Sequence, residues 1–361
     1  MKVLHVGESV MGGVGTYINE LASLQVSLYG AKNVQILVPY EHRHHISNPA
    51  LKHIFTFSRP NRKFGLLYLV VEFVKILRTF KPDIVHAQST IAGFVVRPLC
   101  LFWRIPVVYC PHGWATDMEQ GAFKKKAITH VERVLSHITA RIVAISDYER
   151  EQGIKLGIPA HKLVTVYNGI AQVPPPHDPA PWQDERLKIL FVGRLDRQKG
   201  IDIFLDAIAP LQDTVCARVI GGAVTGGLTV DFKPFPHVEA LGWQTPAQIA
   251  AQMAAGDVVV MPSRWEGFGL VAVEAMRLSK PVIASNVGGL PEIIQHCKTG
   301  YLFPKENVGA LTAMLKQVER QKLQELGVAG YKRFLAYFIA DRMAKNIYKL
   351  YGEIVGTPSK T

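Results

Sequence analysis

Residues 262–276 read PSRWEGFGLVAVEAM and carry more information about the fold than any other segment of the chain. They follow an apolar run, Val258 to Met261, of the kind that forms a buried parallel strand. Proline and glycine interrupt the chain there, and a helix with Glu274 in its first turn is predicted to follow. Glu266 and Glu274 thus flank a glycine-rich loop at the carboxyl end of a strand, where open α/β sheets bind ligands and helix amides bind anions. A charge at a helix start and a solvated turn residue would explain the same two acids without a ligand.

The rest of the chain repeats this strand–loop–helix pattern in two series. In the first, strands are predicted at 2–6, 35–38, 84–86, 107–110, 142–145 and 163–166, and helices at 15–29, 66–80, 90–102, 124–138 and 148–155. In the second, strands are predicted at 188–192, 217–220, 238–240, 258–261, 282–284 and 300–303. Such alternation produces parallel sheets covered by helices. A proline-dense segment, 173–186, lies between the two series and is predicted to be a linker.

We therefore predict an α/β protein with two Rossmann-like domains, 1–172 and 187–337, that face a central cleft. The length of 361 residues and the hydrophobic share of 48% fit two folded cores. A helical pattern over 331–350 predicts a C-terminal helix, about 338–361, that packs back on the first domain. Four cysteines without paired spacing indicate a reducing, cytosolic compartment. No zinc-ligand spacing occurs, and His42, His44 and His45 are expected to be solvated.

The chain is basic, with a formal net charge of +12, and the excess lies mainly in the first half. Residues 1–180 hold 20 Lys and Arg against 12 Asp and Glu. Around 55–69 and 123–126 these basic residues alternate with aromatic and aliphatic ones, which favours an anionic membrane surface over nucleic acid as the partner. An ordinary solvated surface explains the pattern equally well. The apolar stretch 91–110 contains arginines and prolines, so a helix, a turn and a strand are predicted there rather than a membrane span.

Two further segments supply groups that could bind a phosphate. Gly193 and Arg194 follow the first strand of the second series, and Lys199 comes five residues after Arg194. Two cations leaving one strand end could hold a diphosphate, although a basic surface loop would look the same. Gly12 and Gly13 follow the first strand of the chain and permit close approach of a ligand, but they lack the spacing of the dinucleotide fingerprint.

His112 lies between Pro111 and Gly113 at the end of the predicted strand 107–110. A histidine between two turn residues at a strand end is placed to reach a ligand-binding edge. A single histidine is more often structural than catalytic, so the other motifs decide the interpretation.

Taken together, these motifs resemble glycosyltransferase family four, whose members are retaining enzymes of the two-domain GT-B fold, here of the bacterial cell-surface polysaccharide type. The resemblance spans nearly the whole chain and is looser between Tyr40 and Lys81, where such enzymes differ in acceptor. Its strongest parts are Gly193-Arg194 with Lys199-Gly200, Pro262 to Met276, and Gly288-Gly289-Leu290-Pro291-Glu292; Gly12-Gly13, His112 and Val166 to Ile170 also match.

The resemblance implies a role for each matching residue. Arg194 and Lys199 would neutralise the donor diphosphate, and Glu274 would accept hydrogen bonds from the ribose. Glu266 would bind a hydroxyl of the transferred sugar, and His112 would contact that sugar from the opposite domain. The remaining donor-binding positions would line the base, sugar and phosphates: Gly12, Gly13, Gly193, Trp243, Gly267, Phe268, Gly269 and Leu270.

The same resemblance implies a hexosyltransferase that acts without cofactor or metal, since no Asp-x-Asp pair occurs and cations with helix amides would stabilise the leaving group. A front-face mechanism is implied, in which the leaving phosphate helps to deprotonate the acceptor. The expected partners are a UDP-sugar or GDP-mannose, with a slight preference for UDP, a lipid-linked or polysaccharide acceptor, and the inner face of the cell membrane. A sugar-nucleotide epimerase and a non-catalytic nucleotide-sugar sensor are the alternatives.

Overall fold

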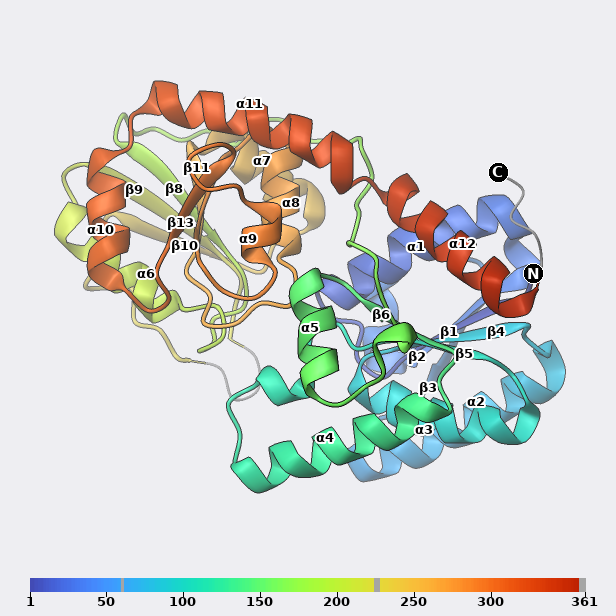
Figure 1. The fold of residues 1–361 in the computed structure, drawn as a ribbon. Coiled ribbons are helices and arrows are strands. Elements are labelled where there is room, and N and C mark those ends of the chain that lie inside the picture. The colour runs from blue at the N-terminus through green and yellow to red at the C-terminus, as the bar shows by residue number, and fades with distance from the viewer. Residues whose placement is uncertain (60–61, 224–227, 357–361) are drawn as a thin grey trace. The chain divides into compact units, whose positions relative to one another are not determined.

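The computed structural model describes residues 1–59, 62–223 and 228–356 and contains two compact units. One unit comprises Met1–Ile170 together with Ala340–Thr361, and the other comprises Ala171–Ile339. Each unit has a parallel sheet covered by helices, as Figure 1 shows. The predicted pair of Rossmann-like domains is thus confirmed.

The first unit is built on a sheet of strand order β3-β2-β1-β4-β5-β6-β7. Every pairing in it is parallel, and the chain reverses its direction of winding between β1 and β4. The strands are β1 (Val3–Gly7), β2 (Val34–Pro39), β3 (Ile54–Phe57), β4 (Ile84–Gln88), β5 (Val107–Cys110), β6 (Arg141–Ala144) and β7 (Leu163–Thr165). The carboxyl ends of β1 and β4 therefore lie at a topological switch point, the edge at which open α/β sheets bind ligands.

Helices cover both faces of this sheet. Figure 1 shows α1 (Gly13–Tyr29) and α12 (Ala340–Val355) on one face, and α2 (Arg62–Phe80), α3 (Thr90–Trp103) and α4 (Ala122–His137) on the other. The short α5 (Asp147–Lys155) precedes β7, and 3₁₀ turns occur at η1 (Ala31–Asn33), η2 (Tyr40–His45), η3 (Ala115–Asp117) and η4 (Ala160–Lys162). The apolar sides of α2 and α3 pack on the sheet and form the main core of the unit.

The strand β3 was not expected, because its residues were interpreted as part of a basic and apolar surface. Phe57 and Leu69 are buried in the core, and Arg59 forms an ion pair with Glu8 at 2.7 Å. Phe57 and Leu69 therefore belong to the core and not to the predicted membrane surface, whereas Phe64, Leu67 and Tyr68 are exposed. The side chains of residues 60–63, which include Arg62 and Lys63 of that predicted surface, lie outside the described part of the structure.

The apolar stretch 91–110 forms the helix α3, a turn and the strand β5, as predicted. Its Arg97 is fully buried and forms an ion pair with buried Glu132 of α4 at 2.8 Å. The guanidinium also lies over the ring of Tyr109, 4.1 Å from its centroid, and the hydroxyl of Tyr109 donates to Glu132 at 3.0 Å. A buried arginine with these partners ties α3 to α4 and to the sheet. Within the described ranges, no helix is long and apolar enough to cross a membrane.

The second unit has a parallel sheet of order β10-β9-β8-β11-β12-β13. Its strands are β8 (Leu187–Val192), β9 (Val215–Ile220), β10 (Val238–Gly242), β11 (Val258–Met261), β12 (Val282–Ser285) and β13 (Gly300–Phe303). Its helices are α6 (Ile201–Ile208), η5 (Ala209–Leu211), α7 (Pro246–Ala255), α8 (Leu270–Arg277), α9 (Leu290–Ile293), α10 (Val308–Gln317) and α11 (Arg320–Tyr337). All six strands predicted for this half are present.

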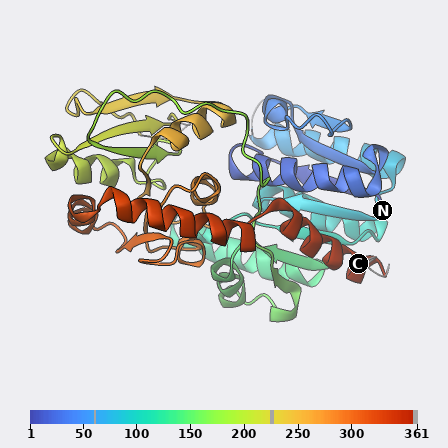
Figure 2. The same cartoon turned by 90° about the horizontal axis from the view of Figure 1, so that it is seen from above.

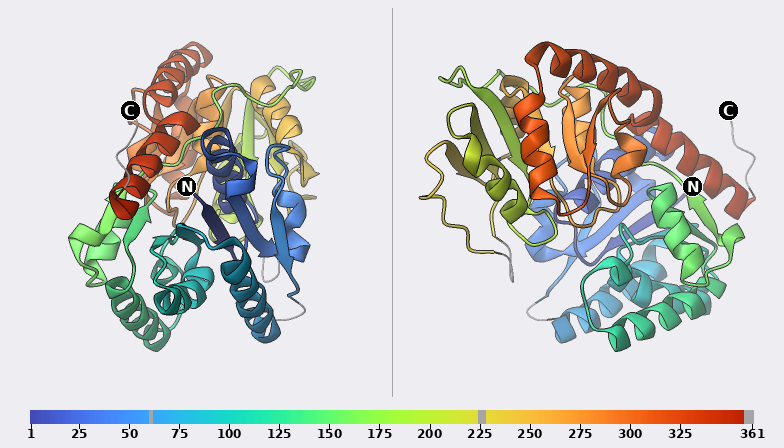
Figure 3. Two further views of the ribbon diagram at one scale, coloured as in Figure 1. Left: turned by 90° about the vertical axis from the view of Figure 1, so that its right-hand side faces the viewer. Right: turned by 60° about the vertical axis from the view of Figure 1, so that its left-hand side comes forward.

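The helical pattern predicted over 331–350 is two helices rather than one. Figures 2 and 3 show the interruption between α11 and α12, which falls at Phe338 and Ile339. Phe338 is buried in the second unit against the ring of Phe268, at a centroid distance of 5.8 Å. The amide of Ala340, the first residue of α12, donates to the carbonyl of Ile170 at 2.9 Å, so α12 begins where the chain of the first unit ends.

Candidate active site

The cationic loop and the glycine-rich acidic loop of the second unit lie side by side because β8 and β11 are neighbours in the sheet. Gly193 to Gly200 follows β8, and Pro262 to Gly269 follows β11, so both loops leave the carboxyl edge of the same pair of strands. Parallel sheets place ligands at this edge. The structure thus brings together Arg194, Lys199 and Glu266, which the sequence separates by up to 72 positions.

Lys199 and Glu266 form the centre of this site. The ammonium of Lys199 lies 2.6 Å from Oε2 of Glu266, and both side chains are mostly shielded from solvent. The hydroxyl of Ser263 lies 3.4 Å from the same carboxylate oxygen. The Lys199 chain passes directly over Gly193, where an added Cβ would lie 3.2 Å from Cγ of the lysine. Gly193 therefore provides the space in which the lysine reaches the acidic loop.

Arg194 takes part in a second, more exposed group of contacts. Its guanidinium lies 2.9 Å from Asp196 and donates to the side-chain carbonyl of Gln198 at 2.6 Å. The amide of Lys199 donates to Asp196 as well, at 3.0 Å. The loop thus contains two cations, each next to one carboxylate, which is an arrangement that can exchange an internal carboxylate for the phosphates of a ligand.

The acidic loop is held in place by a glycine pair after β12. Gly288 has a φ of +55°, and an added Cβ would lie 1.8 Å from the carbonyl oxygen of Glu266. The amide of Gly289 donates to the same carbonyl at 3.1 Å. A side chain at position 288 would displace Glu266, and the amide of Gly289 holds the same carbonyl, so the Gly288-Gly289 motif supports the backbone that carries the acid.

Glu274 lies farther along its helix than expected. α8 begins at Leu270, so Glu274 is its fifth residue and belongs to the second turn, not the first. Its side chain is half-buried. The chain enters α8 through Gly267, Phe268 and Gly269, and the ring of Phe268 is buried against Phe338.

Trp243 lies at the end of β10, with an exposed fraction of 60%. An added Cβ at Gly222 would lie 2.5 Å from Nε1 of the indole, so the ring rests on the backbone that follows β9. The neighbouring loop that was expected to shape base recognition, 223–229, includes residues 224–227, which lie outside the described residues. Trp243 is thus placed next to the loop after β9, and among the described residues no hydrogen bond or ring contact joins it to Lys199 or Glu266.

Arg264 is a residue of this site that sequence reasoning missed. It is buried, and its guanidinium lies 2.6 Å from Asp202 and 2.5 Å from Glu306. It also donates to the carbonyl of Arg197 at 2.9 Å, and its own amide donates to Gln198 at 2.8 Å. Its hydrogen bonds to Asp202 above all, and those to Glu306, raise its pKa further. Arg264 therefore fastens the acidic loop to the cationic loop, but its partners are too distant in sequence to have been recognised.

The first unit carries Gly12, Gly13 and His112 at the carboxyl edge of its own sheet. Gly12 caps α1 with a φ of +64°, and Gly13 is the first residue of the helix. The amide of Val10, in the same loop, donates to Nδ1 of His42 at 3.4 Å. His42 is buried, so the expectation that it is solvated is wrong: its role is to support the loop between β1 and α1.

His112 follows β5 with a φ of +55°, a conformation that few non-glycine residues adopt. Its Nε2 lies 2.7 Å from Oε1 of Gln88, and its ring packs edge-on against Tyr17 at 4.8 Å. The next amide, Gly113, donates to buried Glu149. Burial lowers the pKa of His112 from 6.5 to about 3, so the imidazole is neutral at physiological pH.

These sites can do different chemistry. The second unit concentrates two cations, two acids and a helix start, a set suited to a ligand with both phosphates and hydroxyls. The first unit offers a neutral imidazole and glycine backbone, which suit an uncharged hydroxylated group. In the described parts of the chain, no group of three or more His, Cys, Asp or Glu side chains is arranged to hold a metal ion.

Comparison with known proteins agrees with this division. Residues 11–171 match the family model described as Glycosyltransferase Family 4, and residues 176–333 match that described as Glycosyl transferases group 1. An uncharacterized 41.2 kDa protein in the cps region of Klebsiella pneumoniae is 34% identical over 329 residues, which is 87% of this chain and 89% of that protein. A D-inositol 3-phosphate glycosyltransferase of Pseudarthrobacter chlorophenolicus is 27% identical over 82% of this chain and 79% of its own length.

Solved structures share the fold of the whole chain. A sucrose-phosphate synthase from Thermosynechococcus elongatus superposes with a TM-score of 0.85 at 20% identity, over 99% of this chain and 100% of that one. Anabaena HepE in complex with UDP and glucose superposes with a TM-score of 0.79 at 21% identity, over 97% and 98%. The fold is thus that of the two-domain GT-B glycosyltransferases. The chain belongs to the family-4-like glycosyltransferases.

Proposed function

We propose that this glycosyltransferase is a retaining, metal-independent hexosyltransferase that uses a nucleotide diphosphate sugar. The observation that carries the proposal is the contact between Lys199 and Glu266 at 2.6 Å, which joins a cationic loop to an acidic one at a ligand-binding edge. Such a pair has one group for the phosphates of a donor and one for a hydroxyl of its sugar.

The cations account for catalysis without a metal. Cleavage of the bond between the sugar and the diphosphate leaves negative charge on the phosphate oxygens. Arg194 and Lys199 neutralise that charge as it develops, and the amides at the start of α8 add to the stabilisation. The departing phosphate accepts the proton of the acceptor hydroxyl, and the new glycosidic bond forms on the face from which the diphosphate leaves.

The remaining residues position the donor. Glu274 accepts hydrogen bonds from the ribose, Trp243 lies beside the base, and His112 contacts the transferred sugar. UDP is the preferred nucleotide, a choice supported by the complexes of the structural neighbour HepE with UDP and with UDP-glucose. GDP-mannose is the other donor that the motifs allow.

The acceptor in this proposal is a lipid-linked or polysaccharide glycan of the cell surface, approached at the inner face of the membrane. The support comes from the outer faces of α2, α3 and α4. Exposed apolar side chains gather there beside basic ones: Phe64, Leu67, Tyr68, Val71, Phe94, Leu101, Phe102 and Phe123 with Arg78, Lys81, Arg104, Lys124 and Lys126. We call this set the basic–aromatic face.

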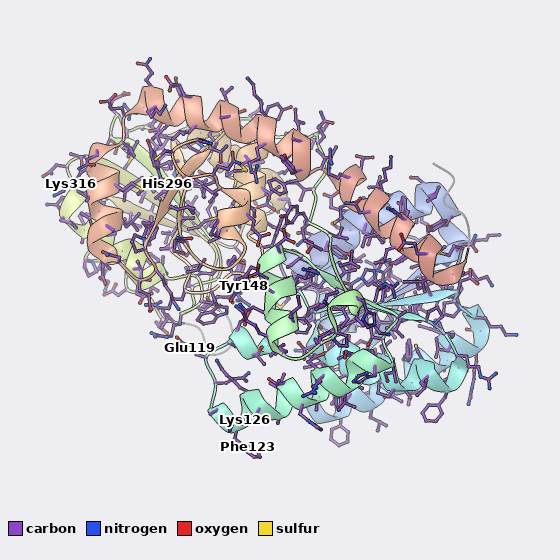
Figure 4. The ribbon with its side chains drawn as sticks, in the orientation of Figure 1. Glu119, Phe123, Lys126, Tyr148, His296 and Lys316 are labelled. Carbon is purple, nitrogen blue, oxygen red and sulfur yellow. The ribbon has the colours of Figure 1, made fainter. Side chains whose placement is uncertain are left out.

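The start of α4 shows the character of the basic–aromatic face most clearly. Phe123 is 87% exposed, and Lys124 and Lys126 are exposed beside it. Figure 4 shows Phe123 and Lys126 directed away from the body of the unit. The other charged groups of α4 include Glu132, whose carboxylate is buried against Arg97. An aromatic ring beside ammonium groups suits the boundary between lipid headgroups and acyl chains.

The donor proposal is tested by single-turnover and steady-state assays with UDP-sugars and an acceptor extract of lipid-linked glycans. Transfer with retention of the anomeric configuration, unaffected by EDTA, is the expected result. Transfer with inversion would contradict the mechanism, and an absolute requirement for a divalent cation would contradict the role given to Arg194 and Lys199. Conversion of a nucleotide sugar to its epimer without acceptor would indicate the alternative chemistry.

A further inference from the structure

A chain of buried hydrogen bonds runs through the first unit and ends on His112. Nε2 of His5, in β1, lies 2.6 Å from Oε1 of Gln25 in α1. Nδ1 of His5 lies 3.3 Å from Nε2 of Gln88 at the end of β4, and Oε1 of Gln88 lies 2.7 Å from Nε2 of His112. His5, Gln25 and Gln88 are fully buried.

The donors and acceptors in these contacts determine which nitrogen of each histidine ring carries the proton. A carboxamide oxygen can accept but not donate, so His5 carries its proton on Nε2, toward Gln25, and its Nδ1 is an acceptor. Gln88 must then turn its NH₂ group toward His5, which directs its oxygen toward His112. The proton of neutral His112 consequently lies on Nε2, and its Nδ1 holds the lone pair.

Burial maintains this order over a wide pH range. It lowers the pKa of His5 to about 4, an effect that the hydrogen bond to Gln25 only partly opposes, and it lowers the pKa of His112 to about 3. Neither ring therefore gains the second proton that would reverse the direction of the hydrogen bonds. The ring of His86 lies 5.4 Å from that of His5, and burial above all, together with His5 and His112, lowers its pKa as well, so it adds no positive charge.

The backbone of His112 is also held in place, by the turn that it forms with Gly113. His112 and Gly113 have φ angles of +55° and +102°, and the amide of Gly113 donates to Glu149, whose other oxygen accepts from the amide of Ile145 at 2.6 Å. The His112 ring is thus held from two sides: by Gln88 at Nε2 and by the strained turn at its backbone. In the described part of the chain, Nδ1 of His112 has no hydrogen-bond partner.

We propose that Gln88 and His5 are positioning residues for the transfer reaction, which hold His112 as the neutral Nε2–H tautomer and present its Nδ1 as a hydrogen-bond acceptor to a sugar hydroxyl. The proposal rests on the proposed function, since that function gives His112 its sugar contact. A neutral acceptor is the appropriate partner for a hydroxyl in a reaction that develops positive charge at the anomeric carbon, because an imidazolium would oppose that charge. Gln88 and His5 act through His112 and do not touch the substrate.

The direct test is ¹⁵N NMR of ring-labelled histidines in the full chain, with the His112 signals identified by their loss in His112→Gln. The wild type is expected to show a protonated Nε2 and an unprotonated Nδ1 from pH 5 to pH 8. In Gln88→Leu the amide is lost, and we expect both tautomers to be populated. A His112 ring that keeps Nε2–H in Gln88→Leu, or carries its proton on Nδ1 in the wild type, would overturn the proposal whatever the activity.

A second variant keeps the shape of the residue and changes its charge. Gln88→Glu places a carboxylate at Nε2, which should raise the pKa of His112 by about 1 to 3 units. Its turnover is then expected to fall as the pH decreases through the new value, while a merely structural role would leave the pH profile in place. If the His112 ring of Gln88→Glu titrated at the higher pH but the pH dependence of turnover matched that of the wild type, the positioning role would be overturned.

Kinetics complete the test. Gln88→Leu is expected to lose about 10- to 100-fold in kcat, with little change in the KM for the donor, by analogy with the loss when the outer partner of a metal-binding histidine is removed. Unchanged kcat in a variant whose tautomers are mixed would overturn the proposal. A failure of the proposed function has a different signature, because it would remove transfer by the wild-type protein as well and leave the NMR result intact. Urea unfolding of each variant identifies any loss of fold.

Discussion

The ligand-binding edges of the two sheets are built in opposite ways. In the second unit, Lys199 pairs with Glu266 and Arg264 with Asp202 and Glu306, so charged side chains hold the two loops together. In the first unit, the side chains that hold the His112 ring are neutral amides and imidazoles whose pKa values are lowered by burial, and the ion pair between Arg59 and Glu8 lies at the ends of β1 and β3. The two units have the same type of sheet, but the side chains at their ligand-binding edges differ in charge.

This difference matches the ligands that the proposed function gives to the two edges. A diphosphate carries charge that grows during transfer, and cations stabilise it most strongly. A sugar ring carries hydroxyls and develops positive charge, so neutral donors and acceptors suit it better. The proposed function accordingly places the leaving group at the second unit and a sugar hydroxyl at the neutral His112 of the first.

The largest expected effect comes from removing a cation of the second unit. Lys199→Ala should reduce turnover by on the order of 100-fold or more, because the developing charge on the diphosphate loses its partner. Lys316→Ala is the matched control, since Lys316 is an exposed lysine of α10 in the same unit, marked in Figure 4. Steady-state kinetics with saturating donor measure both. Equal activity of the two variants would show that the charge of Lys199 does not stabilise the leaving group.

The next effect concerns Arg264, which acts through the loops and not on the ligand. Arg264→Met removes its ion pairs with Asp202 and Glu306 and its bond to the carbonyl of Arg197. We expect a loss of about 1 to 3 kcal/mol in the free energy of unfolding, since a buried donor set is removed while both carboxylates stay partly solvated. Urea unfolding measures the stability, and Arg342→Met at an exposed position of α12 serves as the control. An unchanged midpoint would show that the loops are held by other contacts.

The buried neutral histidines of the first unit should make the stability of the protein sensitive to acid. His5, His86 and His112 have folded pKa values below the unfolded value of 6.5, so the unfolded chain binds more protons once the pH falls below 6.5. The free energy of unfolding should therefore decrease on acidification from 6.5 toward the folded values, by up to about 1.4 kcal/mol per pH unit for each histidine.

Urea unfolding at pH 7, 6 and 5 checks this dependence. His112→Gln should show a shallower loss of stability below pH 6 than the wild type, by about 1 kcal/mol per pH unit. His130→Gln, at an exposed position of α4, should follow the wild type. Parallel curves for His112→Gln and the wild type would mean that the ring is not held in its neutral form.

The smallest expected effect on turnover lies outside both edges, on the basic–aromatic face. Replacement of Lys124 and Lys126 by Glu should weaken binding to phosphatidylglycerol vesicles by at least tenfold at low salt, since each charge near the surface contributes about 1 kcal/mol. Turnover of a water-soluble acceptor should not change. Lys316→Glu is the control, and vesicle cosedimentation is the measurement. Equal binding by all three proteins would exclude this face as the site of membrane contact.

The sequence was sufficient for the sheets and for the second-unit motifs because these depend on local patterns. Apolar strand runs followed by glycine-rich loops identify parallel strands wherever they occur, and Lys199 and Glu266 were found because each lies next to such a strand. The strand β3 was missed because a short edge strand with Phe57 on its inner side has the same composition as an amphipathic surface.

The remaining features depend on contacts between distant residues. Arg264 meets Asp202 and Glu306 across 62 and 42 positions, and His112 meets Gln88 across 24. Nothing in a single sequence indicates such pairs. Glu274 was placed one turn too early because α8 begins at Leu270, directly after Gly269, which is earlier than the sequence pattern indicated.

The central claim is that the second unit binds the diphosphate of a nucleotide sugar through Lys199 and Arg194, and isothermal titration of UDP tests it most directly. The full chain should bind UDP without added metal, and Lys199→Ala and Arg194→Ala should each weaken the Kd by at least tenfold, a loss of about 1.4 kcal/mol. Lys316→Ala should bind as the wild type does. The claim would be contradicted if neither UDP nor GDP bound more tightly than inorganic phosphate. It would also be contradicted if neither substitution changed the affinity for UDP.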